Sequence, residues 1–232
     1  MKSTNASNVM IKEKHQYAAL LENQHANAIL SRAYQPLYWI HSDWVAKALP
    51  AHFPIEVNCI KTNSFVSQAL NIPTSFDLDT QMELTKFLLL DGQLIEKVMG
   101  VLGLCLYQQA LKMLISKHIK LEIDANLGCD ATDIVLKKLP FMLSDFPSEL
   151  SKDDDRFTSI NSLPCFVSEG LSVFKQIVSS CASYEFLRFA LSPKYQSLER
   201  EHSLSEHTCK KTTLLLRKLA IEIDRTCSNL LK

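Results

Sequence analysis

Glycine is scarce in this chain, at five of 232 residues. Average usage predicts about three times as many. Hairpins and phosphate-binding loops use glycine where the backbone needs positive φ, so its scarcity argues against both. Leucine is abundant and runs of β-branched residues are rare. The composition therefore predicts an all-α fold, with helices joined by short polar turns.

An excess of charge of one sign is also missing. Lysine plus arginine equal aspartate plus glutamate at 25 each. A chain that binds nucleic acid or an anionic membrane normally carries a basic surplus. Only the tail 194–232 has one, with eight basic and five acidic residues, and a surplus of three is typical of a solvated helix face. We therefore expect no nucleic-acid partner.

Close pairs of cysteine are absent. The chain has seven cysteines, an odd number, and they are widely spaced. Structural zinc sites need close cysteine or histidine pairs, so we expect no metal there. Most of the cysteines lie in apolar stretches, as Cys105 and Cys165 do, where a thiol behaves as a small core residue. This usage fits a reducing compartment.

No apolar segment is long enough to span a bilayer. The longest, Val98 to Tyr107, is about half the required length. The first residues, MKSTNASNVMIKEKHQ, contain no apolar core of a secretory signal. We expect a soluble protein that stays in the cytoplasm.

The spacing of apolar residues divides the chain into three parts. Residues 1–10 are predicted to be disordered, residues 11–195 to form one compact multi-helix domain, and residues 196–232 to form a C-terminal amphipathic helix. In the first half we expect helices at about 11–32, from Ser42 as N-cap to Leu49, and within 55–70, closed by Asn71 and Pro73.

Residues 80–139 have the clearest helical pattern. Thr80 is a candidate cap for a first helix, which breaks at Asp91-Gly92. Gly100 and Gly103 lack side chains, so a neighbouring helix could approach closely there. Residues 119, 123 and 127 are apolar at a spacing of four and lead to Gly128, a natural C-cap. The alternation in IKLEID (119–124) also fits a strand, but we favour a helix. Asp130 is a predicted N-cap, with Asp133 as its capping-box acid.

The second half is predicted to continue with a polar loop at 144–161 and helices at 162–178 and 183–191, opened by Ser162 and Ser183. From Ser197 the chain is predicted to form one long amphipathic helix. Its apolar stripe consists of Leu215, Leu219, Ile223, Cys227 and Leu230. Such a stripe must be buried, and the pattern leaves two places open: the chain's own helical domain, or a partner or second copy.

Residues arranged for chemistry are few. Two E-x-x-H pairs, Glu22/His25 and Glu199/His202, have the spacing of di-iron bundles, but both lie in polar stretches. The DDD run at 153–155 lacks the spacing of a calcium loop. His41 lies between two tryptophans, where we expect a turn residue that holds backbone groups. The sequence therefore predicts no catalytic residue, metal or cofactor.

Three segments in order resemble one family. The first is LYWIHSDWVAKALP, which includes Tyr38, Trp39, His41 and Trp44. The second is FLLLDGQLIEKVMGVLGLCLYQQALKMLISKHIKLEIDANLGCDATDIVLKKLP, and the third is GLSVFKQIVSSCASYEFLRFALSPKY. Their order and spacing over about 34–195 are similar to those of the SctK family (YscK, PscK, OrgA and MxiK), accessory proteins of the type III secretion sorting platform. Ser42 stands where the family often has proline.

The resemblance implies a non-enzymatic adaptor at the cytoplasmic face of the bacterial inner membrane. Its partners would be the pod protein SctQ and the cytoplasmic domain of the ring protein SctD, and indirectly the stator SctL and the ATPase SctN. The resemblance implies contact with the membrane only through these partners. Two other hypotheses remain open: a different helical interaction module, such as a secretion chaperone or effector, and an enzyme with an unfamiliar site. We expect the four aromatic-segment residues to serve mainly as structure.

Overall fold

A computed structural model describes residues 28, 31–32, 34–73, 82–152, 163–178, 181–195 and 203–231 of the chain. These residues form helices and no strand. The predicted all-α fold is therefore confirmed for the described part. The expected disordered residues 1–10, most of the helix expected at 11–32, and Thr80, Ser162 and Ser197 lie outside it.

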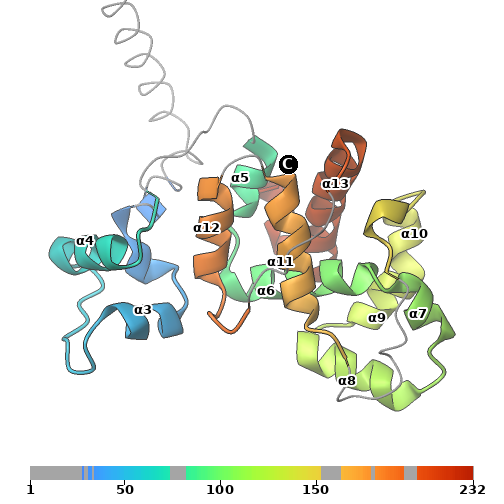
Figure 1. The fold of residues 1–232 in the computed structure, drawn as a ribbon, viewed down its shortest axis with the longest axis horizontal. Coiled ribbons are helices and arrows are strands. Elements are labelled where there is room, and N and C mark those ends of the chain that lie inside the picture. The colour runs from blue at the N-terminus through green and yellow to red at the C-terminus, as the bar shows by residue number, and fades with distance from the viewer. Residues whose placement is uncertain are drawn as a thin grey trace, which may run out of the picture.

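The molecule is elongated, and its helices are arranged along the long axis (Figure 1). At one end lie a 3-10 turn Pro36–Tyr38, α3 (Ser42–Ala48) and α4 (Ile60–Ala69). The centre holds α5 (Met82–Phe87), α6 (Gly92–Cys105), α11 (Phe166–Ile177), α12 (Cys181–Ala190) and α13 (Glu206–Ile223). The other end holds α7 (Gln108–Met113), α8 (Lys117–Leu127), α9 (Ala131–Asp133), a π-helical turn Ile134–Lys138 and α10 (Leu139–Met142). Short 3-10 turns lie at Ser148–Leu150 and Arg225–Asn229.

The centre of the fold is the close crossing of α6 and α11. A Cβ atom placed on Gly103 would lie 1.9 Å from the carbonyl oxygen of Phe166. A Cβ atom on Gly170 would lie 2.0 Å from the carbonyl oxygen of Met99. Each helix therefore offers a glycine to the backbone of the other, and the two backbones touch directly. The close approach predicted at Gly103 is confirmed, and Gly170 is its counterpart on α11.

A buried carboxylate lies next to this crossing. Glu169 on α11 accepts a hydrogen bond from the Tyr107 hydroxyl at 2.8 Å and pairs with the Lys152 ammonium at 2.6 Å. The backbone N–H of Lys152 donates to the Leu106 carbonyl at 2.7 Å. A buried charge is tolerated only when it is paired and hydrogen-bonded. This network therefore ties residue 152 to the ends of α6 and α11.

Several helix ends follow the prediction. Gly128 ends α8 in the left-handed conformation at φ 63°, and Asn71 follows α4 at φ 51°. Asp91 caps α6 by accepting from the Gln93 N–H. Residues 117–127 form one helix, so the preference for helix over strand at 118–124 is confirmed.

Other helix ends differ from the prediction. His41, not Ser42, is the N-cap of α3, because its Nδ1 accepts from the Asp43 N–H. Asp130 precedes α9 but makes no side-chain cap. Asp124 on α8 accepts from both the N–H and the hydroxyl of Thr132 at 2.7 Å instead. A carboxylate from a neighbouring helix has taken the place of the local cap.

Three more features differ from the prediction. The helix expected within 55–70 begins only at Ile60, since residues 53–59 form a loop. Ser183 lies inside α12 rather than at its start. The π-helical turn directly precedes Pro140. The ring nitrogen of proline cannot donate a hydrogen bond to the preceding helical turn, and the π turn accommodates the missing hydrogen bond.

The glycine crossing yields a testable prediction. Gly103→Ala should lower the free energy of unfolding by about 3 kcal/mol, because the new methyl group meets a backbone carbonyl that cannot rotate away. Gly100→Ala is the matched control on the same helix. Its methyl group would meet Leu127 Cδ2 at 2.4 Å, a movable side-chain end, and alanine favours the helix by about 1 kcal/mol. Urea unfolding followed by circular dichroism measures both, and equal losses would contradict the crossing.

Candidate interaction surfaces

The aromatic segment predicted from the sequence packs against α12. The Trp39 ring stacks on Phe186 with centroids 4.9 Å apart and an interplanar angle of 18°. Its indole N–H donates to the Arg32 carbonyl at 2.7 Å. Figure 1 shows α3 and α4 reaching the rest of the molecule beside α12. Trp39 thus contributes to the joint between the N-terminal end and the centre.

Trp44 and His41 make the neighbouring contacts of the same joint. The Trp44 indole N–H donates to the Leu191 carbonyl at 2.9 Å, and its ring meets Phe189 edge-on with centroids 5.2 Å apart. The Arg188 guanidinium lies 4.9 Å from the Trp44 ring centroid. The backbone N–H of His41 donates to the Phe189 carbonyl at 2.9 Å. These contacts are all within the chain.

Tyr38 differs from the other three residues. Its side chain is exposed, and its hydroxyl donates to the Asn58 side chain. The buried Asn63 amide holds the same region together, since it accepts from the Leu37 N–H and donates to the Val57 and Cys59 carbonyls. Tyr38 therefore lies at the edge of the joint rather than within it.

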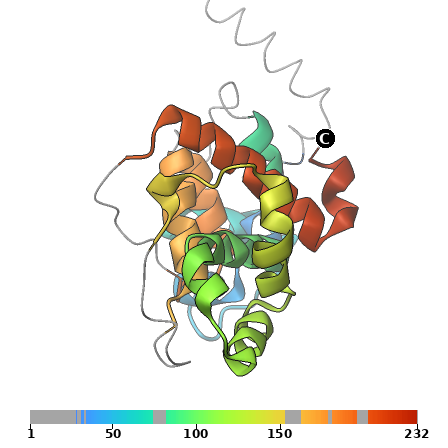
Figure 2. The same ribbon diagram turned by 90° about the vertical axis from the view of Figure 1, so that its right-hand side faces the viewer.

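The C-terminal stripe faces the chain's own core. α13 packs on α6 and α11 and reaches α5, as Figure 2 shows from the side. Leu215, Leu219 and Cys227 are buried, while Ile223 and Leu230 are half-buried and pack against the core. The structure thus places the stripe where the chain's own helices cover it, rather than on an exposed surface.

The last helix is also shorter than predicted. α13 begins after Ser205, whose hydroxyl accepts from the Thr208 N–H, and Glu149 accepts from the Ser205 N–H and hydroxyl. It ends at Asp224, whose carboxylate accepts from the Thr226 N–H and starts a 3-10 turn. Cys227 and Leu230 therefore lie beyond the helix.

An exposed apolar surface lies at the N-terminal end. We call it the α4 surface, and it consists of Phe53, Ile55, Val57, Ile60 and Phe65. Ile60 is 84% exposed and Phe65 47%. The Phe53 and Phe65 rings stack on each other with centroids 6.2 Å apart, so these two residues of the surface are in contact. α4 buries Thr62, Asn63 and Val66 on its opposite face.

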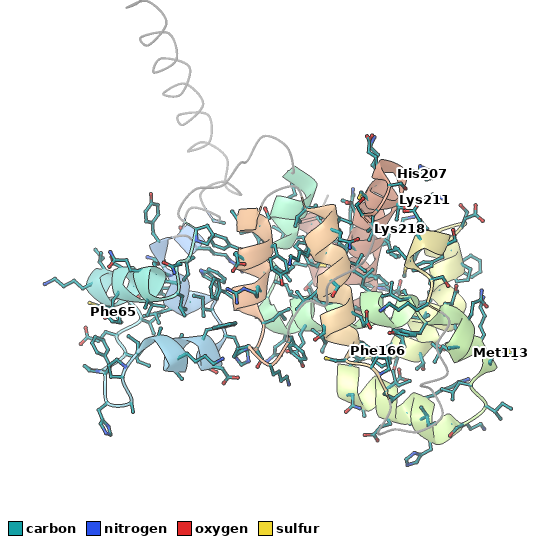
Figure 3. All side chains as sticks on the ribbon, in the orientation of Figure 1. Phe65, Met113, Phe166, His207, Lys211 and Lys218 are labelled. Atoms are coloured by element: carbon teal, nitrogen blue, oxygen red, sulfur yellow. The ribbon has the colours of Figure 1, made fainter. Side chains whose placement is uncertain are left out.

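A second exposed apolar surface lies at the other end of the molecule. We call it the α7–α8 surface, and it consists of Met113, Ile115 and Leu121. They are 81%, 94% and 69% exposed. Figure 3 labels Phe65 at one end of the long axis and Met113 at the other. All three lie within the segment 113–121, and contiguous exposed apolar patches mark interaction sites.

The sequence prediction missed both surfaces, although one signal was present. Leu121 falls between Ile119 and Ile123, which point to the core, so at helical spacing it faces the opposite side. Ile60 and Phe65 likewise lie off the buried positions of α4. The signal in each case is a large apolar residue out of phase with the core stripe.

Side chains that could bind a metal do not cluster in the described part of the chain. No three His, Cys, Asp or Glu side chains within it lie together as metal ligands. Burial raises the pKa of Cys129 to about 11 and that of Cys105 still further, which disfavours the reactive thiolate. Hydrogen bonds from Thr62 lower the pKa of Cys59, at the start of α4. Both E-x-x-H pairs and the DDD run lie outside the described residues.

A cleft of about 380 Å³ separates the aromatic joint from α6. Arg32, His41, Asp91, Gln93 and Glu96 supply its polar lining. The Arg32 guanidinium is already used there, since it donates to the Leu89 carbonyl at 2.9 Å and to that of Leu90 at 3.2 Å. It caps the residues that follow α5, so the cleft is a structural junction.

Comparison with protein families decides the affiliation. The model of the family described as YOP proteins translocation protein K (YscK) matches residues 30–232. The chain belongs to the YscK family. This confirms the resemblance noted in the sequence, and the match includes α13. No curated protein matches the chain.

A solved structure of similar fold supports the affiliation. It is the cytoplasmic domain of the type III secretion sorting platform protein PscK from P. aeruginosa. The two share 17% sequence identity at a TM-score of 0.59, over 86% of this chain and 96% of that one. At this identity the likeness concerns the fold. In the described part of this YscK-family chain, no helix combines the length and apolar character needed to cross a membrane.

The aromatic joint yields a second prediction. Trp44→Ala should lower the free energy of unfolding by about 3 kcal/mol, since it removes ring packing and a hydrogen bond. Tyr38→Ala is the control and should change it by less than about 1 kcal/mol, because Tyr38 is exposed. Thermal melts measure both. A Trp44→Ala variant that melts like wild type yet fails to bind a partner would make this segment an interface.

The C-terminal stripe yields a third prediction. Leu219→Ala should cost about 2–5 kcal/mol of stability, because Leu219 is fully buried. Leu214→Ala on the same helix should change stability by less than about 0.5 kcal/mol, because Leu214 is exposed. Denaturant unfolding of both variants is the measurement. Unchanged stability of Leu219→Ala together with loss of a partner or of a dimer would assign the stripe to an interface.

Proposed function

We propose that the chain is a non-enzymatic adaptor of the type III secretion sorting platform in the bacterial cytoplasm. It links the pod protein SctQ to the cytoplasmic domain of the ring protein SctD, and through them reaches the stator SctL and the ATPase SctN. Its contact with the inner membrane is through these partners. Membership of the YscK family and the fold shared with a sorting platform protein support this proposal.

One structural observation carries the adaptor role. The α4 surface and the α7–α8 surface lie at opposite ends of the elongated molecule (Figure 3). Apolar residues in exposed clusters favour association, and truncating an interface hot spot costs about 2 kcal/mol or more. A protein with one such surface at each end can hold two partners at once without conflict between them.

The packing between the two ends supports the same role. α6 and α11 cross in backbone contact, and α12 joins them to the aromatic segment through Trp39 and Trp44. Close-packed helices transmit force with little compliance. The two surfaces are therefore held at a fixed separation, as a spacer between two parts of a machine requires.

The proposal predicts that each surface serves a different partner. Ile60→Ser with Phe65→Ser should weaken binding of one of the two platform proteins by at least about tenfold, and Met113→Ser with Ile115→Ser should do so for the other. Each pair should leave the second partner's affinity unchanged. Calorimetry with purified SctQ and the SctD cytoplasmic domain measures both affinities.

Leu214→Ser is the control, because Leu214 is exposed on α13, outside both surfaces. All variants should melt like wild type, since the replaced side chains are exposed. The adaptor role fails if wild type cannot hold both proteins in one ternary complex on size exclusion. It also fails if both variant pairs weaken the same partner.

A further inference from the structure

The α7–α8 surface is exposed for a structural reason. α7 ends at Met113, Leu114 turns toward the core, and Ile115 lies in the short connection to α8. α8 buries Ile119, Ile123 and Leu127, so Leu121 points away from the core. The three exposed side chains thus come from one chain segment, 113–121.

The same segment carries a surplus of positive charge. Residues 108–121 contain Lys112, Lys117 and Lys120 and no aspartate or glutamate, and the first acidic residue, Glu122, directly follows Leu121. Within the described part of the chain, no carboxylate forms an ion pair with any of the three. The next lysines along the chain differ, since Lys137 pairs with Asp133 and Lys138 with Glu222.

The α4 surface has no such bias. Glu56 and Lys61 are its charged neighbours along the chain, one of each sign, and both are exposed. The two ends of the molecule therefore differ in electrostatics, although both are apolar. Only the α7–α8 surface selects for a partner of opposite charge.

A protein helix fits the α7–α8 surface better than a membrane does. Each lysine near an anionic bilayer contributes about 1 kcal/mol, so three give only marginal attachment. The surface also lacks the tryptophan and tyrosine that anchor side chains at membrane interfaces. Methionine, by contrast, is frequent where proteins bind amphipathic helices.

We propose that the α7–α8 surface binds an acidic amphipathic helix of a partner protein. Apolar side chains of that helix pack on Met113, Ile115 and Leu121, and its carboxylates meet Lys112, Lys117 and Lys120. This inference rests on the proposed adaptor function, because it states which chemistry one of the two ends accepts.

The test uses the full-length chain and a labelled helical peptide of roughly 18 residues, about five turns. The peptide carries a leucine stripe with glutamate elsewhere, and a matched peptide replaces each glutamate with lysine. Fluorescence anisotropy should give at least about tenfold tighter binding of the glutamate peptide, because like charges oppose the lysine peptide. Lys112→Glu with Lys117→Glu and Lys120→Glu should reverse this preference.

Two further variants locate the site. Met113→Ser with Ile115→Ser and Leu121→Ser should abolish binding of the glutamate peptide, whereas Phe65→Ser with Lys61→Glu on the α4 surface should leave it unchanged. Equal binding of both peptides by wild type would overturn the inference. Tighter binding to phosphatidylcholine–phosphatidylglycerol vesicles than to the peptide, lost in the same lysine variant, would overturn it in favour of a membrane surface.

The inference and the adaptor function can fail separately. If wild type binds SctQ and SctD together but shows no preference between the peptides, the adaptor function stands and this inference is wrong. If the peptide preference is found but neither platform protein binds, the acidic partner lies elsewhere and the adaptor function is wrong.

Discussion

The backbone contact between α6 and α11 is the interaction on which the other contacts of the molecule depend. Gly103 and Gly170 bring each helix against the other's carbonyl groups, a spacing that no side chain larger than hydrogen permits. Glu169, one residue from Gly170, is then placed where the Lys152 ammonium can neutralise it and the Tyr107 hydroxyl can donate a hydrogen bond to it. α13 closes over the same pair with Leu215 and Leu219. The apolar stripe of the last helix thus completes the core that the crossing begins.

This arrangement separates stability from recognition. The buried apolar side chains form one core that runs through the centre and into both ends. α12 connects this core to the N-terminal end through Trp39 and Trp44. Two groups of exposed apolar side chains, the α4 surface and the α7–α8 surface, lie at the two ends (Figure 3). A chain with zero net charge can still have distinct ends. Near the α7–α8 surface, Lys112, Lys117 and Lys120 form no ion pair with a described carboxylate, whereas the α4 surface has one charged neighbour of each sign, Glu56 and Lys61. The proposed adaptor function requires such a difference between the two ends, because two different partners would be held in a fixed order.

The sequence predicted the helical class, the close approach at Gly103 and the left-handed cap at Gly128, because each depends on one residue type with few alternatives. The prediction was wrong where a tertiary contact replaced a local helix cap or where a loop replaced the start of a helix. Asp124 took over the capping of α9 from Asp130, and the loop at 53–59 shortened α4. The apolar stripe of α13 was predicted. Periodicity shows that such a face must be buried, but it does not show whether the chain's own core or a partner buries it. The two exposed surfaces were missed for two reasons. A search for buried stripes passes over residues such as Leu121, which is out of phase with the stripe of α8, and Ile115 continues the apolar pattern in the sequence although α7 ends before it, at Met113.

Hydrogen exchange followed by mass spectrometry tests this account most directly, on the chain alone and in complex with SctQ and the SctD cytoplasmic domain together. In the free chain, amides of α6 and α11 around Gly103 and Gly170 should exchange slowest, at the rate set by global unfolding. In the complex, protection should rise at 53–65 and at 112–121, and the amides around Leu215 and Leu219 should not change. Protection that rises along α13 while either end stays unchanged would contradict the account.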